Sequence, residues 1–412
     1  MTDLTPHIAE GSGVWWSQTT AEPTPLVHAL LRQIPDIGSV RAFVGMSLDK
    51  TFADGLPDQL SVISYGGLGE LGKLSSRGLL DVVPCHYSAL PRLFEQRLLP
   101  CDVGLIQVSP PDAAGYCSLG VGVDYVADAI PHTRVLIAEV NKQMPVTRGA
   151  MKLHVSRFAS TLETDRPLPE VPDRAPSAVE MAIASNVAGL VSDGDTIQTG
   201  VGSLPGAVLS ALSNHRDLGV HSGMISDGVV SLIDKGVLTG ACKEVDTGVL
   251  VTGAALGTSS LYGRLAELPI EFRPASYTHA PSVLSQLRSL VAINSAIEVD
   301  LTGQVGAETR GESYVGAVGG QVDFCRAASL TGGRSIIALR STSRGASTIK
   351  SALEFGSVTT ARSDVDFVVT EHGVASLRGV GLVERARRLT AVAAPEHREL
   401  LERSMTLTDC AS

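Results

Sequence analysis

Short runs of apolar and β-branched residues recur along the chain, each bounded by glycine, proline or aspartate. Such runs are typical of β-strands, and several lack the alternation expected of a strand with one side facing solvent. They therefore predict strands that are covered on both faces. The expected strands are residues 39–46, 59–65, 102–108, 134–140, 195–201, 245–251, 335–339 and 365–370.

Between these runs, apolar residues recur at helical spacing. The expected helices are residues 178–191, 203–212, 227–235 and 382–394. Strands that alternate with helices in this way predict βαβ crossovers and a largely parallel sheet. The expected fold class is therefore α/β, with open sheets.

One segment, residues 161–176, contains four prolines and several charges, so neither a strand nor a helix can extend through it. We expect the domain boundary there, which gives an N-terminal α/β domain over residues 1–175 and a C-terminal α/β domain over residues 176–412. A length of 412 residues is enough for two such domains. Ligands of open α/β sheets bind at the carboxyl ends of strands, so the cleft between the two halves is the expected site.

Composition narrows the classes of protein. The formal net charge is -10 and no block rich in lysine or arginine occurs, which argues against a nucleic-acid partner. Residues 1–21 lack a signal-peptide pattern and no eighteen apolar residues run unbroken, so we expect a cytoplasmic globular protein without a membrane partner. The six cysteines contain no C-x-x-C pair, which argues for reduced thiols and against a metal site.

A literal G-x-G-x-x-G spans residues 67–72 behind an expected strand. A dinucleotide-binding fingerprint needs a helix after the glycines and an acidic residue about twenty positions further on. Neither is clear here, so a turn-rich glycine loop is the favoured interpretation. A nicotinamide-dependent oxidoreductase stays an alternative that depends on this motif alone.

A second glycine loop, Gly200-Val201-Gly202, lies between an expected strand and a helix for which Ser203 is the expected N-cap. Free backbone amides at such a turn can stabilise an oxyanion or a phosphate, although a plain turn is an equal alternative. A third loop, residues 316–323, again precedes a helix-like stretch. The loops together indicate an extended ligand with phosphates and a polarised carbonyl group.

Side chains with catalytic potential are few. No G-x-S-x-G, H-E-x-x-H or Walker lysine motif occurs. His154, His221 and His372 are each more often structural than catalytic. Glu371 follows an expected strand, where a carboxylate can face the cleft, although it can equally pair with an arginine such as Arg378.

Longer motifs cover nearly the whole chain beyond about residue 60. They are residues 99–112, 115–120, 138–141, 144–145, 200–205, 218–221, 294–304, 319–324, 370–373 and 377–379. In these segments the chain resembles the acetyl-CoA hydrolase/transferase family, which includes 4-hydroxybutyrate and acetate CoA-transferases. The resemblance implies two similar α/β halves, chemistry at the seam between them, and coenzyme A (CoA) bound largely by the second half. It places CoA at Val318, Gly319, Gly320 and Gln321.

The resemblance also implies a nucleophile that this chain lacks. Family members carry a glutamate in the segment matching residues 221–228, at the position of Gly223. That carboxylate attacks the acyl-CoA carbonyl and then holds CoA as a glutamyl thioester. Without this carboxylate the enzyme has no positioned nucleophile, and such positioning lowers the activation barrier by about 7 to 11 kcal/mol. Ordinary CoA transfer should therefore be crippled.

What stays is a CoA cleft with space beside the thioester. Water would give hydrolysis there, and a nucleophile within the acyl group would give cyclisation with release of CoA. The candidate bases are His221 and Glu371, and Ser222 is a replacement nucleophile without an identified activating partner. The alternatives are CoA transfer by a different residue and a catalytically dead CoA-binding protein, including one in which Gly223 was engineered. A homodimer is the expected assembly.

Overall fold

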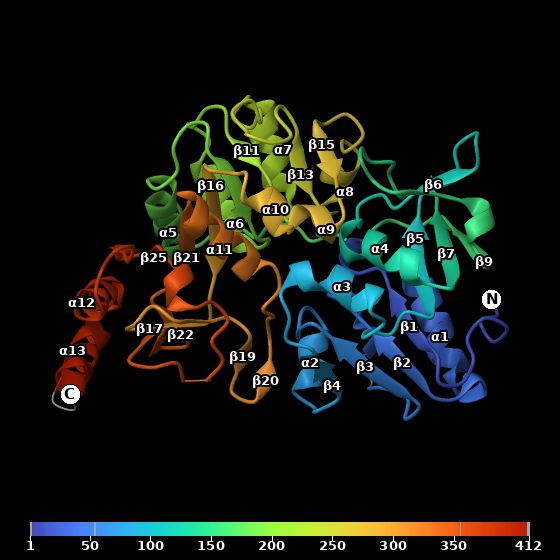
Figure 1. The fold of residues 1–412 in the computed structure, drawn as a ribbon, viewed down its shortest axis with the longest axis horizontal. Helices are drawn as coiled ribbons and strands as arrows, with labels where there is room; N and C mark the ends of the chain where they lie inside the picture. Colours follow the sequence, from blue (N-terminus) through green and yellow to red (C-terminus); the bar gives the residue numbers. More distant parts are fainter. Residues whose placement is uncertain (1, 53–54, 355, 410–412) are drawn as a thin grey trace. The chain divides into compact units, whose positions relative to one another are not determined.

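The structure is a computed structural model, and it describes residues 2–52, 55–354 and 356–409. The chain forms two compact units, each built on its own mainly parallel sheet (Figure 1). Unit 1 comprises Met1–Pro172, Val251–Ala280 and Ser313–Gly319, and unit 2 comprises Asp173–Leu250, Pro281–Glu312 and Gly320–Ser412. The first crossing falls in the expected proline-rich segment, whereas no sequence pattern predicts the two later returns to unit 1.

The sheet of unit 1 has seven strands in the order β4-β3-β2-β1-β5-β7-β9, and all neighbours are parallel. The strands are β1 (Gly13–Trp16), β2 (Val40–Phe43), β3 (Leu60–Ser64), β4 (Leu80–Val82), β5 (Val103–Val108), β7 (Val135–Asn141) and β9 (Ser160–Thr164). The strand order reverses between β1 and β5, which makes this an open doubly wound sheet.

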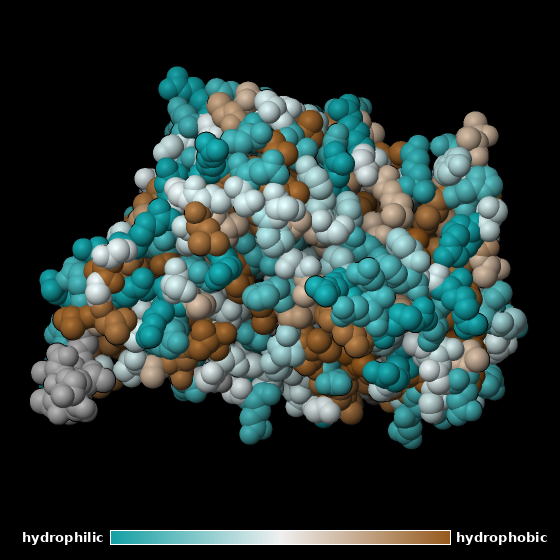
Figure 2. Space-filling view, in the orientation of Figure 1, coloured by the Kyte–Doolittle hydropathy of each residue, from teal (hydrophilic) through white to brown (hydrophobic). Residues whose placement is uncertain are grey.

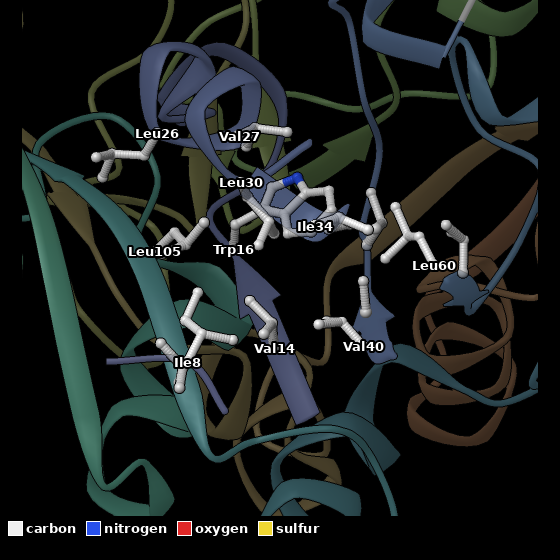
Figure 3. Packing of buried hydrophobic residues seen from close by; sticks show 14 of the residues in the cluster. Ile8, Val14, Trp16, Leu26, Val27, Leu30, Ile34, Val40, Leu60 and Leu105 are labelled. Carbon is white, nitrogen blue, oxygen red and sulfur yellow. The ribbon is translucent and has the colours of Figure 1, made fainter. Parts of the chain in front are cut away.

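Helix α1 (Thr24–Ile37) supplies much of the apolar core of unit 1. Its Leu30 and Ile34 pack over Trp16 of β1 and Leu105 of β5, and all four side chains are buried (Figure 3). Burying each such side chain stabilises the fold by about 1.5 to 3 kcal/mol. Shortening Leu30 to alanine would leave a cavity at a cost of about 2 to 5 kcal/mol.

Shorter elements complete unit 1. Its other helices are α2 (Leu71–Ser75), α3 (Leu90–Glu95), α4 (Asp124–Ala129), α8 (Ser259–Tyr262) and α9 (Ala275–Thr278), with 3-10 turns η1 (Thr19–Ala21), η2 (Lys50–Phe52), η3 (Tyr87–Ala89), η4 (Ile130–His132) and η5 (Val155–Arg157). Its other strands are β6 (Tyr116–Ser118), β8 (Lys152–His154), β14 (Ala254–Ala255), β15 (Ile270–Phe272) and β20 (Ser313–Tyr314), and β13 (Leu250–Thr252) begins at the boundary with unit 2.

The sheet of unit 2 has six strands in the order β11-β10-β16-β21-β25-β26. Neighbours from β11 to β25 are parallel, and β25 and β26 form an antiparallel hairpin. The strands are β10 (Thr196–Thr199), β11 (Gly219–Val220), β16 (Leu290–Ser295), β21 (Arg334–Ala338), β25 (Phe367–Thr370) and β26 (Gly373–Ser376). The expectation of two open, largely parallel α/β domains is confirmed.

The helices of unit 2 are α5 (Ala178–Ala188), α6 (Ser203–Ala211), α7 (Asp227–Asp234), α10 (Pro281–Leu284), α11 (Gln321–Thr331), α12 (Leu382–Val392) and α13 (Pro395–Asp409), with the 3-10 turn η6 (Arg362–Asp364). Helix α11 packs on β16 and β21, burying Phe324 and Ala328. Helix α12 packs on β26 and α13 packs on α12, at one end of unit 2 (Figure 1). Small strands lie outside the main sheet: β12 (Met224–Ile225), β17 (Glu298–Asp300), β18 (Val305–Gly306), β19 (Thr309–Arg310), β22 (Thr342–Ser343), β23 (Ala346–Ser347) and β24 (Ile349–Lys350).

One expected strand, residues 245–251, is wrong over most of its length. The segment turns instead, and β13 begins only at Leu250. Asp246 and Gly248 have φ angles of 54° and 76°, in the left-handed region that an extended strand does not enter. The glycine and aspartate in this run are therefore turn residues rather than strand ends.

Two further expectations concern membrane-spanning segments and the state of the cysteines. On the face drawn in Figure 2, hydrophilic residues are interspersed with hydrophobic ones. In the part of the chain that the structure describes, no helix is both long and apolar enough to cross a membrane. The five described cysteines are free thiols, and Cys101, Cys117 and Cys325 are buried.

Candidate functional site

The carboxyl edge of the unit 2 sheet gathers most of the residues that the sequence singles out. Strands β11, β10, β16, β21 and β25 run parallel, so the segments that follow them emerge at one edge. These segments carry His221–Gly223 after β11, Gly200–Gly202 after β10, and Glu371 after β25. These sequence candidates therefore share one edge of the sheet, and their roles stay predictions.

The loop Gly200–Gly202 joins β10 to α6 and is open. Gly202 has a φ of 119°, which only glycine adopts readily, and a Cβ atom there would meet no heavy atom within 4 Å. A Cβ atom at Gly200 would touch only Cγ of Pro205, at 3.9 Å. The backbone beside both glycines is thus accessible to a ligand, and Val201 lies half-buried between them.

The expected N-cap of α6 is wrong by one residue. Gly202 is the N-cap, and Ser203 is the first helical residue. The hydroxyl group of Ser203 donates to Oε1 of Glu180 at 2.6 Å instead of capping its own helix. The early backbone amides of α6 therefore receive no side-chain cap.

The segment His221–Gly223 continues directly from β11. The amide of His221 donates to the carbonyl oxygen of Ile197 at 3.1 Å, and the side chain of His221 is fully buried. Ser222 is also buried, and its Oγ donates to the carbonyl oxygen of Thr199 at 3.0 Å. Gly223 follows with intermediate exposure. The hydroxyl group of Ser222 therefore donates its proton to a main-chain carbonyl oxygen rather than to a basic side chain.

Glu371 lies in the turn between β25 and β26. Its carboxylate accepts hydrogen bonds from Ser341, at 2.9 Å from the amide and 2.7 Å from the hydroxyl group. Partial burial raises the pKa of Glu371, but these bonds outweigh burial and hold the pKa below its usual value. The alternative partner Arg378 pairs instead with Asp366, at 2.6 Å.

The sheet separates Glu371 from the His221–Gly223 segment. Strands β11 and β25 are four intervals apart in the strand order. At about 4.8 Å per interval, the two strand ends lie about 19 Å apart. Glu371 and His221 are therefore not neighbours on this edge, and their catalytic roles stay predictions.

The four residues expected to bind CoA lie where the chain passes from unit 1 to unit 2. Val318 and Gly319 end the last segment of unit 1, and Gly320 is the N-cap of α11. Gly319 has a φ of 53° and accepts a hydrogen bond from the amide of Tyr87 at 2.9 Å. Gln321 donates from its side chain to Oγ1 of Thr360 at 3.0 Å. Their role in binding CoA stays a prediction.

The G-x-G-x-x-G of residues 67–72 has a packing explanation within unit 1. The amide of Gly67 donates to the carbonyl oxygen of Gly316, and a Cβ atom at Gly67 would lie 2.3 Å from the carbonyl oxygen of Tyr314. At Gly69 a Cβ atom would lie 2.0 Å from the carbonyl oxygen of Ser47. These glycines let backbone segments approach each other closely, so the motif needs no dinucleotide.

A buried carboxylate that the sequence interpretation missed, Glu180, lies at the same edge of the unit 2 sheet. Its Oε2 accepts from the amide and the hydroxyl group of Ser177, both at 2.8 Å. Its Oε1 accepts from Ser203 at 2.6 Å and lies 2.8 Å from Nη2 of Arg340. Burial raises the pKa of Glu180, but these four donors together lower the pKa to about 2. Glu180 is therefore ionised throughout the neutral range.

A cavity of about 430 Å³ opens beside Arg340, the ion-pair partner of Glu180, entirely within unit 2. Its lining includes Leu204 from the first turn of α6 and three arginines, Arg310, Arg340 and Arg344. The remaining lining residues are Ser295, Ala296, Ile297, Ala338, Leu339, Thr342, Ser343 and Thr348. Guanidinium groups bind phosphates through paired N–H donors, so the cavity suits a phosphorylated ligand.

Part of this arrangement was visible in the sequence. Ser177 followed three residues later by Glu180, before an apolar run, is a capping-box pattern, and the structure forms that box at the start of α5. Arg310 belongs to β19, whereas Arg340 lies in the segment between β21 and β22 and Arg344 lies in the turn after β22. Nothing local marks them as neighbours. Within the described ranges, no cluster of residues suited to hold a metal ion is found.

Comparison with known proteins identifies the class. A family model described as the acetyl-CoA hydrolase/transferase N-terminal domain matches residues 1–172, and the corresponding C-terminal domain model matches residues 257–405. The chain therefore belongs to the acetyl-CoA hydrolase/transferase family, as the sequence motifs predict. The enzymes of this family act on CoA thioesters.

Individual relatives are similar over nearly the full chain. The 4-hydroxybutyrate coenzyme A transferase of Clostridium kluyveri is 41% identical over 403 residues, covering 96% of this chain and 94% of the relative. The crystal structure of RipA from Yersinia pestis has a TM-score of 0.92 and 34% identity, covering 98% of this chain and 95% of the other. A 4-hydroxybutyrate CoA-transferase from Porphyromonas gingivalis has a TM-score of 0.82 and 36% identity, covering 98% and 96%.

Proposed function

We propose that the protein releases CoA from an acyl-CoA, by hydrolysis or by cyclisation of the acyl group, without a covalent enzyme intermediate. The observation that carries the proposal is the identity of residue 223. The resemblance to the family implies a glutamate nucleophile at this position, and the chain has Gly223 there. A glycine has no atom that can attack the thioester carbonyl.

The chemistry then requires a nucleophile from outside the protein chain. In hydrolysis, water forms a bond to the thioester carbonyl carbon, the C–S bond breaks, and the CoA sulfur leaves as a thiolate that takes up a proton. In cyclisation, a hydroxyl or amino group of the acyl chain takes the place of water. Either reaction needs a base for the proton of the attacking group and donors for the oxyanion.

Residues at the carboxyl edge of unit 2 suit these roles. The open backbone of Gly200–Gly202 before the uncapped start of α6 is the candidate oxyanion site. His221 is the preferred base, because it lies two residues before Gly223, the position that the resemblance gives to the nucleophile. Glu371 is a weaker candidate base, since its carboxylate is held by Ser341. Ser222 is a weak candidate for a replacement nucleophile, since its hydroxyl group donates to Thr199.

Substrate binding is proposed at the cavity of unit 2 and at residues 318–321, which are the end of one segment of unit 1 and the start of the next segment of unit 2. The three arginines of the cavity would hold phosphate groups of CoA, and the backbone of residues 318–321 would contribute further contacts. In this proposal CoA enters as part of the substrate and leaves as product, and no metal takes part. A homodimer is proposed as the assembly.

The test is incubation with a panel of acyl-CoA thioesters, including 4-hydroxyacyl and aminoacyl derivatives that can cyclise. Free thiol and product mass are measured together. Release of thiol with a free acid, a lactone or a lactam supports the proposal, and the product identifies the nucleophile. Binding of CoA without thiol release from any thioester would contradict it and identify a CoA-binding protein.

The second candidate function, CoA transfer by a different residue, is favoured by the 41% identity to a 4-hydroxybutyrate coenzyme A transferase. It predicts exchange of CoA between an acyl-CoA and acetate, with a CoA adduct on the protein in the intact mass. The variant Gly223→Glu supplies the matched comparison. Gly223→Glu should gain both the exchange and the adduct under either function. The unmodified protein should show both under the second candidate function and neither under the first.

A further inference from the structure

We propose that Glu180 is a positioning residue that orients the guanidinium group of Arg340 to bind a phosphate group of CoA in the unit 2 cavity. The proposal deepens the proposed function and rests on it for the identity of the ligand. Its geometric basis is the network of Ser177, Glu180, Ser203 and Arg340 at the carboxyl edge of the sheet.

The carboxylate of Glu180 is saturated with donors. An ionised carboxylate offers about four acceptor positions, two on each oxygen. Oε2 accepts two hydrogen bonds from Ser177, and Oε1 accepts one from Ser203 and one from Arg340. A carboxylate bound in this way has no lone pair left to take a proton from a substrate, so its role is to hold the groups that surround it.

Glu180 is itself fixed by secondary structure. The reciprocal bonds with Ser177 form the capping box of α5, so the side chain is anchored where its own helix begins. The bond from Ser203 ties the same carboxylate to the first turn of α6. Arg340 therefore pairs with a carboxylate that α5 and α6 both hold in place.

Arg340 alone would not be well ordered. Its side chain is 49% exposed, whereas that of Glu180 is only 6% exposed. Ordering a long exposed side chain costs up to about 2 kcal/mol of rotamer entropy. The ion pair with Glu180 orders the side chain of Arg340 before the ligand binds. The pair involves Nη2, so the other N–H groups of the guanidinium stay available to bind an anion.

The charge around the cavity favours an anion. Arg310 and Arg344 also line it, and no ion pair involves either of them within the described part of the chain. Three guanidinium groups against one buried carboxylate leave a local positive charge, in a chain whose formal net charge is -10. The phosphorylated nucleotide end of CoA matches this chemistry, whereas its pantetheine end carries no charge.

The test compares CoA, adenosine 3′,5′-bisphosphate and pantetheine by calorimetric titration. Glu180→Gln replaces one carboxylate oxygen with an amide nitrogen, which donates hydrogen bonds and accepts none, and it removes the charge. We expect it to weaken both phosphorylated ligands about tenfold, because Arg340 loses the partner that orients it, and to leave pantetheine unchanged. Arg340→Ala should give the same pattern, and the double variant should lose no more than either single variant.

A matched control is Arg216→Ala, which removes an exposed arginine of unit 2 that pairs with Asp193 and does not line the cavity. It should leave all three affinities unchanged. Arg340→Ala keeps the test open if Glu180→Gln does not fold. The proposal is overturned if a folded Glu180→Gln binds the bisphosphate normally, if Arg340→Ala does so, or if pantetheine weakens equally.

The two proposals can fail separately. If the unmodified protein binds the bisphosphate in a Glu180-dependent way but releases thiol from no thioester, the positioning role stands and the proposed reaction fails. If thiol is released while the Glu180→Gln and Arg340→Ala variants bind CoA as tightly as the unmodified protein, the reaction stands and the positioning role fails.

Discussion

The hydroxyl group of Ser222 donates a hydrogen bond to the main-chain carbonyl oxygen of Thr199, at 3.0 Å in a buried environment. This bond joins the ends of β10 and β11, beside the position where the family resemblance implies a nucleophile. A serine that attacks a thioester must give its proton to a base. Ser222 instead gives its proton to a carbonyl group, which is not basic.

Ser222→Ala should therefore keep the release of thiol within about threefold of the unmodified protein, while losing about 1 kcal/mol of unfolding free energy. Thiol-release kinetics and denaturant unfolding measure the two effects. Ser210→Ala is the matched control, because Ser210 makes a similar bond to the carbonyl oxygen of Gly206 at an exposed site. A loss of more than a hundredfold in rate for Ser222→Ala alone would make Ser222 the nucleophile.

The two glycines of the loop before α6 should respond differently to alanine. Gly202→Ala forces a side chain into a φ of 119°, at a cost of about 1 to 3 kcal/mol of stability. Gly200→Ala meets only Pro205 at 3.9 Å and should change stability by less than about 1 kcal/mol. If the loop binds the oxyanion, Gly200→Ala should still slow thiol release, because the methyl group blocks the approach to the backbone.

Thermal melting and thiol-release rates of the same two variants separate stability from activity. An unchanged rate for a folded Gly200→Ala would remove this loop from the oxyanion role.

The bond between Glu371 and Ser341 should be visible in the pH dependence of stability. Because hydrogen bonds hold the pKa of Glu371 below its usual value, its contribution is present above the unfolded pKa and is lost as pH falls through the folded pKa. Glu371→Gln should cost about 1 to 3 kcal/mol at pH 7. The difference from the unmodified protein should shrink below about pH 4.5.

A double-mutant cycle with Ser341→Ala checks the assignment. The two changes should be less than additive, because they remove the same hydrogen bond. Strict additivity would show that Glu371 is stabilised by something else.

Glu22 in unit 1 should produce the opposite dependence. Burial raises its pKa from 4.5 to about 7, against hydrogen bonds from Ser47 and Trp16 that lower it. The folded protein therefore holds a proton that the unfolded chain has lost, so stability should fall as pH rises from about 4.5 to 7. The contribution of this one group is on the order of 3 kcal/mol.

Denaturant unfolding across this range measures the effect, and Glu22→Gln should flatten the pH profile. Glu163→Gln, at an exposed position of β9, is the control and should leave the profile unchanged. An identical pH profile in Glu22→Gln would contradict the buried, protonated state of Glu22.

The cysteines should react at very different rates with a thiol reagent in the folded state. Cys242 is exposed, whereas Cys325 is buried and burial raises its pKa to about 12. Only a thiolate attacks the reagent, so Cys325 should stay unmodified until the protein unfolds. Mass mapping after brief labelling checks this, and Cys242→Ser should lower the background in the thiol-release assay. Modification of Cys325 before Cys242 would contradict the buried position.

The sequence by itself determined the class of fold and the edge on which the candidate site lies. Apolar runs separated by helical segments are buried when the runs form a sheet that helices cover on both faces. This pattern predicted β3, β5, β7, β10, β21 and β25. Other elements carried too weak a local signal. Strand β1 has four residues and α1 contains Pro25 and Pro35, and packing rather than propensity stabilises both.

Only the tertiary structure decided which polar groups meet. Glu180 and Arg340 are 160 positions apart, and they pair because α5 begins beside the end of β21 at one edge of the sheet. Glu371 and His221 look equally suitable as bases in the sequence, yet four strand intervals separate them. The periodicity of apolar residues indicates which face of an element is buried. Which polar side chains meet depends on the distances between strands, and the strand order that sets these distances is not a local property of the chain.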